Sequence, residues 1–299
     1  MPRPALSWVS FALISAASFA GMAVCVRYAS TTLPQTEVVF FRNFMALLLL
    51  LLLLKQQRVS LKTERIGLHL LRTLTGLTAM YLYFYALSHL PLAGAMLLNY
   101  TSPLFIAAIA TIWLKESWTR PRMLALGLGF AGVLLLFSPS SAIASLAGLM
   151  GLASGALAGL ALATVKKLSA TEPALRTVTW FALLSSLISA VPMLFDFQWP
   201  DATTWGWLIA VGLLANIGQL GLTIAYSKAP ATQVSPLGYS SLLFAGLIGY
   251  LLWGELPDVW GTAGAVLVTL AGIMVARERS EPLPAPPGAV PAIEEQELR

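Results

Sequence analysis

Two stretches of the chain, 139 residues apart, decide how it folds. They are ALSHLPLAGAMLLNYTSPLFIAAIATIWLKE at residues 86–116 and AYSKAPATQVSPLGYSSLLFAGLIGYLLWGE at residues 225–255. Aligned without a gap they agree at ten of 31 positions, among them Pro91 with Pro230, Tyr100 with Tyr239, and Glu116 with Glu255. An apolar composition would pair Leu and Ala by chance, but not Pro, Tyr and Glu at one offset. The chain therefore contains an internal repeat of 139 residues.

The composition around the repeat indicates a membrane protein. The 299 residues are 58% hydrophobic and only 10% charged, and their mean hydropathy is +0.78. A soluble globular domain carries roughly 25% charged residues, so a water-soluble chain of this composition would expose large apolar patches. The single cysteine, Cys25, excludes an internal disulfide framework. These features predict an all-α polytopic membrane protein.

Charged, proline and polar breaks divide the apolar region into ten transmembrane segments of about 20 residues each. The first five are expected at 5–28, 36–54, 67–88, 91–114 and 121–138, and the second five at 145–165, 175–196, 204–227, 231–253 and 258–276. The Pro-rich, acidic segment 277–299 is expected to be a disordered tail.

The basic residues give the orientation of these segments. With the N-terminus and C-terminus cytoplasmic, 16 of the 18 Lys and Arg fall in cytoplasmic loops or flanks, Arg72 among them. Only Arg27 and Arg42 lie toward the other side. This distribution follows the positive-inside rule.

Five segments per repeat mean that the second copy enters the membrane upside down. Residues 5–138 form the first five-helix repeat and residues 145–276 the second, inverted one. Inverted repeats of this kind are typical of transporters, which bind substrate near the middle of the bilayer where the repeats meet. A duplication that only builds a stable membrane scaffold is the alternative. Small residues at four-residue spacing on the first and sixth segments (Ala12, Ala16 and Ala20; Gly151, Gly155 and Gly159) predict close helix packing there.

The chain resembles the drug/metabolite transporter superfamily, and more narrowly its EamA-type exporters. The resemblance rests on Arg42 in FRNFMA, on the Pro-bounded fourth segment that ends in WLKE, and on its second copy that ends in LWGE. It covers about residues 5 to 276. Within the superfamily the sequence is most similar to the aromatic amino-acid exporters of bacterial inner membranes, which implies export of neutral and aromatic amino acids.

Sequence motifs argue against an enzyme. The chain has no GxxxxGK[ST] and no HExxH, and its two histidines, His69 and His89, are 20 residues apart. We therefore expect no metal, no cofactor and no nucleic-acid partner. No Asp or Glu lies in the middle of an expected segment, where a coupled transporter usually has its proton or cation site. This leaves facilitated diffusion, which we expect, coupling through another group, or coupling through the substrate's own charge.

Neutral polar and aromatic side chains are the candidates for substrate binding, because tyrosine offers an apolar ring and a hydroxyl together. They are Tyr81, Tyr85, Asn99, Tyr100, Ser102, Asn216, Gln219, Tyr239 and Ser240. Each of these side chains could instead hold helices together by hydrogen bonds.

The candidates for gating are prolines and membrane-depth cations: Pro91, Pro103, Pro230, Pro236, Arg27, Arg42 and Lys166. Proline removes a backbone hydrogen bond and favours a kink, and we expect the fourth and ninth segments to bend during alternating access. The three cations either extend to the lipid headgroups, meet a substrate carboxylate, or close a gate.

The sequence thus predicts an inner-membrane exporter that acts as a monomer and moves amino acids by alternating access. Other small metabolites, nucleosides or drugs are the alternative substrates. A scaffold or lipid-interacting protein is the alternative from another functional class.

Overall fold

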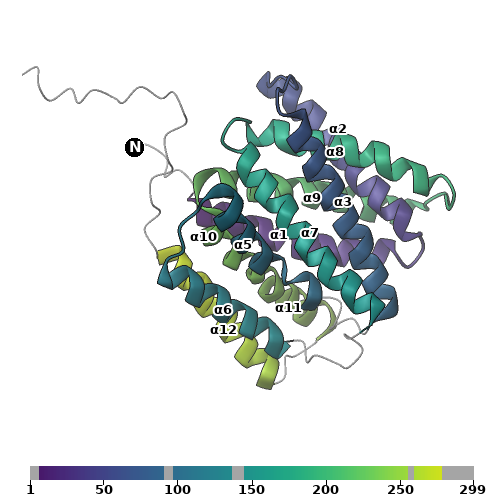
Figure 1. Ribbon diagram of the computed structural model, residues 1–299. Coiled ribbons are helices and arrows are strands. Elements are labelled where there is room, and N and C mark those ends of the chain that lie inside the picture. Colours follow the sequence, from purple (N-terminus) through teal and green to yellow (C-terminus); the bar gives the residue numbers. More distant parts are fainter. Residues whose placement is uncertain (1–6, 91–96, 137–144, 255–258, 278–299) are drawn as a thin grey trace, which may run out of the picture.

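The computed structural model describes residues 7–90, 97–136, 145–254 and 259–277, and every regular element within them is helical. Figure 1 shows the helices as one bundle. They are α1 (Trp8–Ala29), α2 (Gln35–Gln57), α3 (Ile66–His89), α5 (Ser102–Leu114), α6 (Arg120–Leu136), α7 (Leu146–Leu168), α8 (Ala174–Met193), α9 (Ala202–Lys228), α10 (Ala231–Val234), the 3₁₀ helix η2 (Ser235–Tyr239), α11 (Ser240–Trp253) and α12 (Val259–Arg277).

Eight of the described segments are long and apolar enough to cross a membrane. α6 has only 17 residues, and α3 carries His69 and Arg72 within its 24. Both helices nevertheless pack within the bundle, α3 against α7 and α6 against α12. The count of ten spans and the side on which the termini lie therefore stay predictions, as does the division into two domains. The expected tail falls outside the described residues from 278 onward.

Local sequence explains where the helices begin. The side chains of Ser7, Ser145 and Asp201 each accept a hydrogen bond from a backbone N–H in the first turn of α1, α7 and α9. α2 and α8 instead follow Pro34 and Pro173, which the 139-residue offset places on each other. Equivalent segments of the two copies thus start at equivalent prolines.

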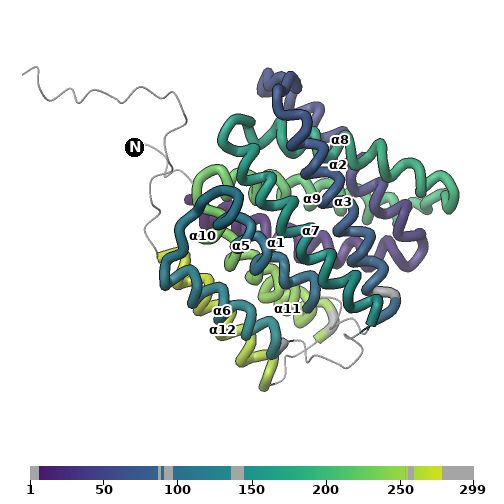
Figure 2. Tube along the Cα trace, viewed as in Figure 1, coloured from purple at the N-terminus to yellow at the C-terminus, as the bar shows by residue number. Residues whose placement is uncertain are grey.

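The helices pack in pairs that are related to one another when the two copies of the repeat are exchanged. α1 packs against α9, and its counterpart α7 packs against α3, the counterpart of α9. α2 packs against its own counterpart α8, and α6 against its counterpart α12. Figures 1 and 2 show α6 and α12 side by side at one edge of the bundle and α2 with α8 at the other. This pairing supports the proposed arrangement of two five-helix repeats.

The glycines of α7 confirm the predicted close packing. A Cβ added at Gly159 would lie 2.7 Å from the Cβ of Phe105 and 2.9 Å from the backbone N of Ile106, both on α5. On the first helix, Ala12, Ala16 and Ala20 are each at most 4% exposed. Small side chains let the backbones approach where lipid supplies no hydrophobic drive.

The ninth expected segment is not one continuous helix. It consists of α10, η2 and α11, and the 3₁₀ turn begins at Ser235 and contains Pro236. Proline has no N–H to donate, so the α-helical ladder is interrupted there. The fourth segment is interrupted as well, by a turn at Tyr100 and Thr101 just before α5. Pro91, at the expected start of that segment, falls outside the described residues.

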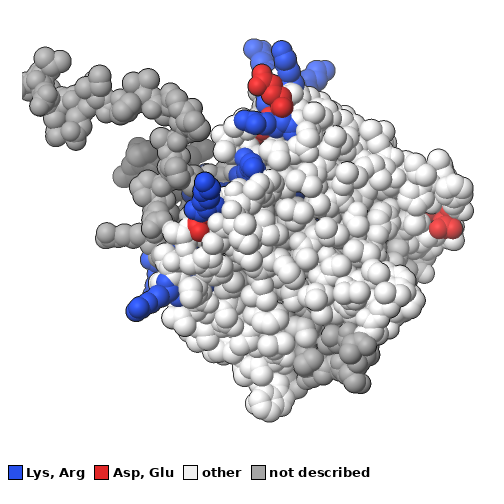
Figure 3. Space-filling model, viewed as in Figure 1, with Lys and Arg blue, Asp and Glu red and all other residues white. Residues whose placement is uncertain are grey.

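The surface of the bundle is largely apolar. Figure 3 shows Lys and Arg gathered along the upper left rim, while the broad face below it is almost free of charge. Within the leucine run of α2, Leu48, Leu51 and Leu52 are exposed, whereas Leu50 and Leu54 are buried against the bundle. An apolar outer face with charges at one rim is the surface that a bilayer requires.

Candidate functional site

A cavity of about 160 Å³ lies where the two interrupted segments meet α1 and α9. Its walls come from α1, the turn before α5, α5, α7, α9, α10, η2 and α11. The lining residues are Ala12, Ser15, Ala16, Phe19, Asn99, Tyr100, Ser102, Pro103, Ile106, Leu162, Leu222, Tyr226, Val234, Ser235, Gly238 and Ser241. Discontinuous helices around a central site are typical of transporters built from inverted repeats.

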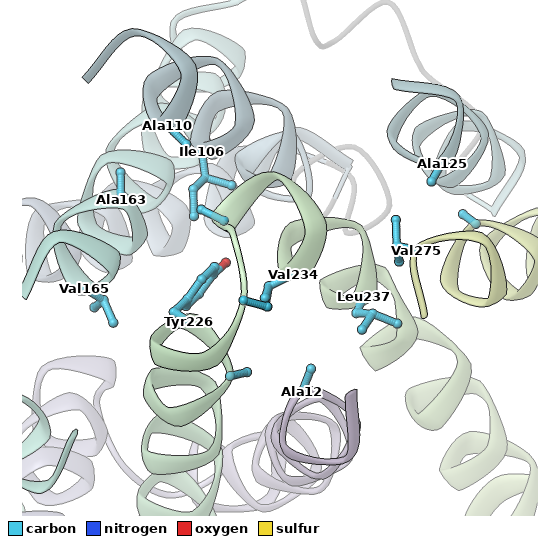
Figure 4. Packing of buried hydrophobic residues seen from close by; sticks show 14 residues of the cluster. Ala12, Ile106, Ala110, Ala125, Ala163, Val165, Tyr226, Val234, Leu237 and Val275 are labelled. Carbon is cyan, nitrogen blue, oxygen red and sulfur yellow. The ribbon is translucent and has the colours of Figure 1, made fainter. Parts of the chain in front are cut away.

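Figure 4 shows four of these lining side chains, each from a different element. Tyr226 of α9 projects toward Ile106 of α5, with Val234 of α10 beside it and Ala12 of α1 below. The hydrophobic part of the wall is therefore assembled from both halves of the chain.

The polar part of the wall shows the repeat most clearly. Ser102 and Ser241, one repeat apart, both line the cavity. The hydroxyl of Tyr100 lies 3.1 Å from Ser241 Oγ, so the two interrupted segments are hydrogen-bonded to each other across the cavity wall. Asn99 Nδ2 donates to Ser154 Oγ at 3.3 Å. Hydroxyl and amide groups set among aromatic and aliphatic side chains suit a small amphipathic solute.

A network of two charged side chains, Glu116 and Lys166, holds the backbone where α9 gives way to α10, beside this cavity. The carboxylate of Glu116 accepts hydrogen bonds from the backbone N–H groups of Ala231 and Thr232, at 2.8 and 2.9 Å, and from Thr232 Oγ1 at 3.0 Å. These are the first residues of α10, where unpaired N–H groups favour a negative charge. The glutamate that ends the first copy of the motif thus holds the start of the interrupted segment in the second copy.

Lys166 of α7 completes the network at the preceding helix end. Its Nζ donates to the carbonyl oxygens of Tyr226 and Ala229, at 2.8 and 2.7 Å. Carbonyls at a helix C-terminus have no partner within the helix, so a lysine there satisfies them. Because Tyr226 also lines the cavity, Lys166 fixes the cavity wall at the junction of α9 and α10.

The structure brings four of the predicted residues to the cavity: Asn99, Tyr100, Ser102 and Pro103. Tyr239 and Ser240 are buried beside it but do not line it. The ring of Tyr239 lies against Gly129 of α6, where a Cβ would come within 2.6 Å of Tyr239 Cδ2.

The other predicted binding residues lie elsewhere in the bundle. Tyr85 is exposed and stacks on His89, with ring centroids 4.2 Å apart, and Tyr81 is half-buried on the same helix. Asn216 donates to the carbonyl of Ala46 on α2, and Gln219 accepts from Arg72 on α3.

The predicted gating residues are dispersed. Pro230 precedes α10 and Pro236 lies in η2, beside the Lys166 network. Arg27 is exposed in the last turn of α1, whereas Arg42 is buried inside the bundle.

Several lining residues were not among the candidates from sequence, notably Ser15, Phe19 and Tyr226. Ser15 could have been found from the sequence, because the repeat places it on Ser154 and both lie on a face of small residues.

The placement of Arg72 requires a correction. The charge count assigned it to the cytoplasmic flank, but the structure buries it in the second turn of α3, 5% exposed.

An ion pair between Glu172 and Arg176 lies at the connection between α7 and α8. Burial raises the pKa of Glu172, between α7 and α8, but hydrogen bonds from Thr63 and Arg176 and the charge of Arg176 outweigh it and hold that pKa below its usual value. The Arg176–Glu172 ion pair is 2.7 Å long. Among the described residues no group of three His, Cys, Asp or Glu could hold a metal ion.

Comparison with known proteins gives one family. The model of the EamA-like transporter family matches the chain twice, over residues 6–138 and 145–277. The pseudopaline exporter of Pseudomonas aeruginosa UCBPP-PA14 is 34% identical over 275 residues, which cover 91% of this chain and 97% of the exporter. The riboflavin transporter of Vibrio cholerae is 29% identical, covering 87% of this chain and 90% of the transporter.

More distant matches agree with these. The S-adenosylmethionine uptake transporter of Rickettsia bellii is 24% identical, over 89% of this chain and 92% of that protein. A protein of known crystal structure superposes with a TM-score of 0.77 at 17% identity, over 90% of this chain and 96% of the other. At that identity the likeness concerns the fold alone.

Proposed function

Because the chain belongs to the EamA-like transporter family, we propose that it exports a small polar metabolite through the cavity between the interrupted segments. The protein is a multi-pass transporter of the bacterial inner membrane and not an enzyme. The observation that carries the proposal is that Ser102 and Ser241, one from each copy, line the same cavity, and that Tyr100 of the first copy is hydrogen-bonded to Ser241 of the second. A site made jointly by both copies can be exposed to one side of the membrane and then to the other when the copies rock against each other.

The relatives bear on the choice of substrate. Their names give pseudopaline, riboflavin and S-adenosylmethionine as substrates, and none of them is named as an amino-acid exporter. Amino-acid export, the expectation from sequence, thus has less support than its alternative, the export of other small metabolites. The 34% identity to the pseudopaline exporters supports export as the direction of transport.

An efflux assay tests the proposal without a known substrate. Proteoliposomes loaded with a small-molecule extract of bacterial cells are incubated, and mass spectrometry identifies the solutes that appear outside. Ser102→Phe fills the cavity and should abolish that efflux, whereas Ser102→Ala should keep most of it. Thr269→Phe is the matched control, because Thr269 is exposed on α12 away from the cavity. No solute released by the wild-type protein, or equal release by Ser102→Phe, would refute the proposed function.

A further inference from the structure

Two arginines are buried inside the bundle. Arg42 of α2 is 8% exposed and Arg72 of α3 is 5% exposed. At a rise of 1.5 Å per residue, Arg42 lies about 10 Å from the start of α2 and Arg72 about 9 Å from the start of α3. The two helices run in opposite directions. Both arginines are linked to one stretch of α9, because Arg72 donates to Gln219, and Asn216, three residues earlier, donates to the carbonyl of Ala46, one turn after Arg42. Both charges therefore lie inside the bundle and not at a headgroup.

The surroundings of the two guanidinium groups are neutral. Arg42 Nε donates to Met22 Sδ at 3.4 Å, and Arg72 Nη2 donates to Gln219 Oε1 at 3.2 Å. Arg72 also lies over the ring of Phe181, 4.0 Å from its centroid. Gly76, one turn further along α3, leaves room for the Arg72 side chain, because a Cβ there would collide with Nη1.

Neither guanidinium contacts a carboxylate within the part of the chain that the structure describes. Glu37, the acid of α2, lies more than one turn before Arg42 and accepts a hydrogen bond from the backbone N–H of Gln198. Arg42 Nη1 is buried and has no hydrogen-bond partner. Arginine stays protonated in proteins, and a buried charge is costly unless an opposite charge pairs with it.

A second polar atom in the same place is also without a partner. Asn216, one turn before Gln219 on α9, donates through Nδ2 to the carbonyl of Ala46, while its Oδ1 is buried and accepts no hydrogen bond. Ala46 is one turn after Arg42 on α2. The region between α2, α3 and α9 thus presents an unpaired cationic donor and an unpaired neutral acceptor.

The cluster adjoins the cavity. Phe19 lines the cavity, and its ring lies against Gly218, the residue before Gln219, where a Cβ would come within 2.8 Å of Phe19 Cε1. Met22, the contact of Arg42, is one turn after Phe19 on α1. Phe19 thus links the cavity wall to the turns of α1 and α9 that contact the two arginines.

We propose that Arg42 and Arg72 form an anion subsite that binds a carboxylate group of the transported solute. The proposal rests on the proposed function and narrows its substrate class to carboxylate-bearing metabolites. Guanidinium groups match carboxylates in shape and form charge-assisted hydrogen bonds with them. The solute occupies the cavity, and its carboxylate extends beside Phe19 to the arginines, where it supplies the negative charge that the described part of the chain does not place there.

The test separates solutes by charge. The small-molecule extract is divided on an anion exchanger into retained and unretained fractions, each is loaded into proteoliposomes, and efflux is measured by mass spectrometry. We expect the wild-type protein to release solutes from the retained fraction. Arg42→Gln and Arg72→Gln should each lower this efflux at least about 10-fold, the effect of losing hydrogen bonds to a charged group. Lys55→Gln, the same change at an exposed position of α2, should leave it unchanged.

Thermal unfolding separates binding from a structural role. Arg42 Nη1 has no hydrogen-bond partner, so Arg42→Gln should unfold at or above the wild-type temperature. Arg72→Gln also loses the hydrogen bond to Gln219 and the contact with Phe181, so the thermal criterion applies to Arg42→Gln. Arg42→Lys keeps the charge and should lower efflux less than Arg42→Gln does. Arg42→Gln that unfolds well below the wild type would show that this arginine is structural, and would overturn the proposal.

The remaining outcomes are also decisive. Wild-type efflux from the unretained fraction alone would overturn the anion subsite and leave the proposed function intact. Efflux from both fractions that depends on chloride or phosphate in the buffer would assign the arginines to a free inorganic anion instead. Release of nothing from either fraction would refute the proposed function itself.

Discussion

Replacement of Glu116 by alanine should loosen the start of α10 and destabilise the protein. The carboxylate accepts three hydrogen bonds, two of them from backbone N–H groups of Ala231 and Thr232, which are 0% and 1% exposed. A hydrogen bond to a charged group contributes about 1.5–3 kcal/mol, and a buried donor left without a partner costs about 1–3 kcal/mol. Since Glu116 itself is partly exposed, solvent weakens these contributions. We expect a loss of about 3 kcal/mol.

The assay for Glu116→Ala is thermal unfolding of the purified protein, followed by fluorescence of its nine tryptophans. A loss of about 3 kcal/mol corresponds to a decrease in Tm of roughly 6–12 °C for a chain of this size class. Glu116→Gln keeps one acceptor oxygen and should lose about half as much. Arg120→Ala, an exposed change four residues away, is the control.

Hydrogen exchange provides a local readout of the same change. The amides of Ala231 and Thr232 should exchange faster in Glu116→Ala than in the wild-type protein, because their acceptor is gone. Equal exchange at these amides, or a decrease in Tm no larger than that of Arg120→Ala, would show that Glu116 does not hold the start of α10.

Three further predictions concern packing, titration and the cavity. Gly159→Ala should cost about 1–3 kcal/mol of unfolding free energy through overpacking against α5, whereas Gly127→Ala, with open space at its Cβ, should be neutral or stabilising; thermal unfolding compares the two, and equal values would contradict the packing. The pKa of Glu172 is lowered, so its contribution to stability is present above its unfolded-state pKa and is lost as the pH falls through its folded-state pKa. Glu172→Gln should therefore flatten the acid side of the curve of Tm against pH. An unchanged curve would contradict the pairing of Glu172 with Arg176. Tyr100→Phe removes the bond to Ser241 and should lower efflux several-fold while Tm changes little; unchanged efflux would exclude that bond from the transport cycle.

Much of the architecture could be predicted from the sequence because chemically distinctive residues, such as proline, recur at the repeat offset. The offset that pairs Pro34 with Pro173 also pairs the helices that those prolines start. Proline at position 236 predicted an interruption, and the 3₁₀ turn η2 lies there. Backbone chemistry of this kind is local, so a sequence reveals it directly.

The side chains of the site were harder to predict, because their environment depends on packing between distant segments. Tyr239 is the repeat partner of Tyr100, yet its ring lies on Gly129 while Tyr100 lines the cavity. A single conformation of an inverted repeat gives equivalent residues different surroundings. Arg72 was assigned to a flank because it lies only six residues into α3. Its burial follows from the contacts of α3 with Gln219 and Phe181, which lie more than 100 residues away.

Labelling of one cavity residue from both sides of the membrane tests the central claim, that this cavity is the alternating-access site, most directly. Cys25 is the single cysteine and is buried, so Cys25→Ala provides a background without thiols. Ser102→Cys in that background places a thiol in the cavity wall. Membrane-impermeant thiol reagents should modify it when added from the cytoplasmic side and, in a separate experiment, from the opposite side, and an exported solute identified in the efflux assay should slow both reactions. Modification from one side only, with or without the solute, would contradict the account.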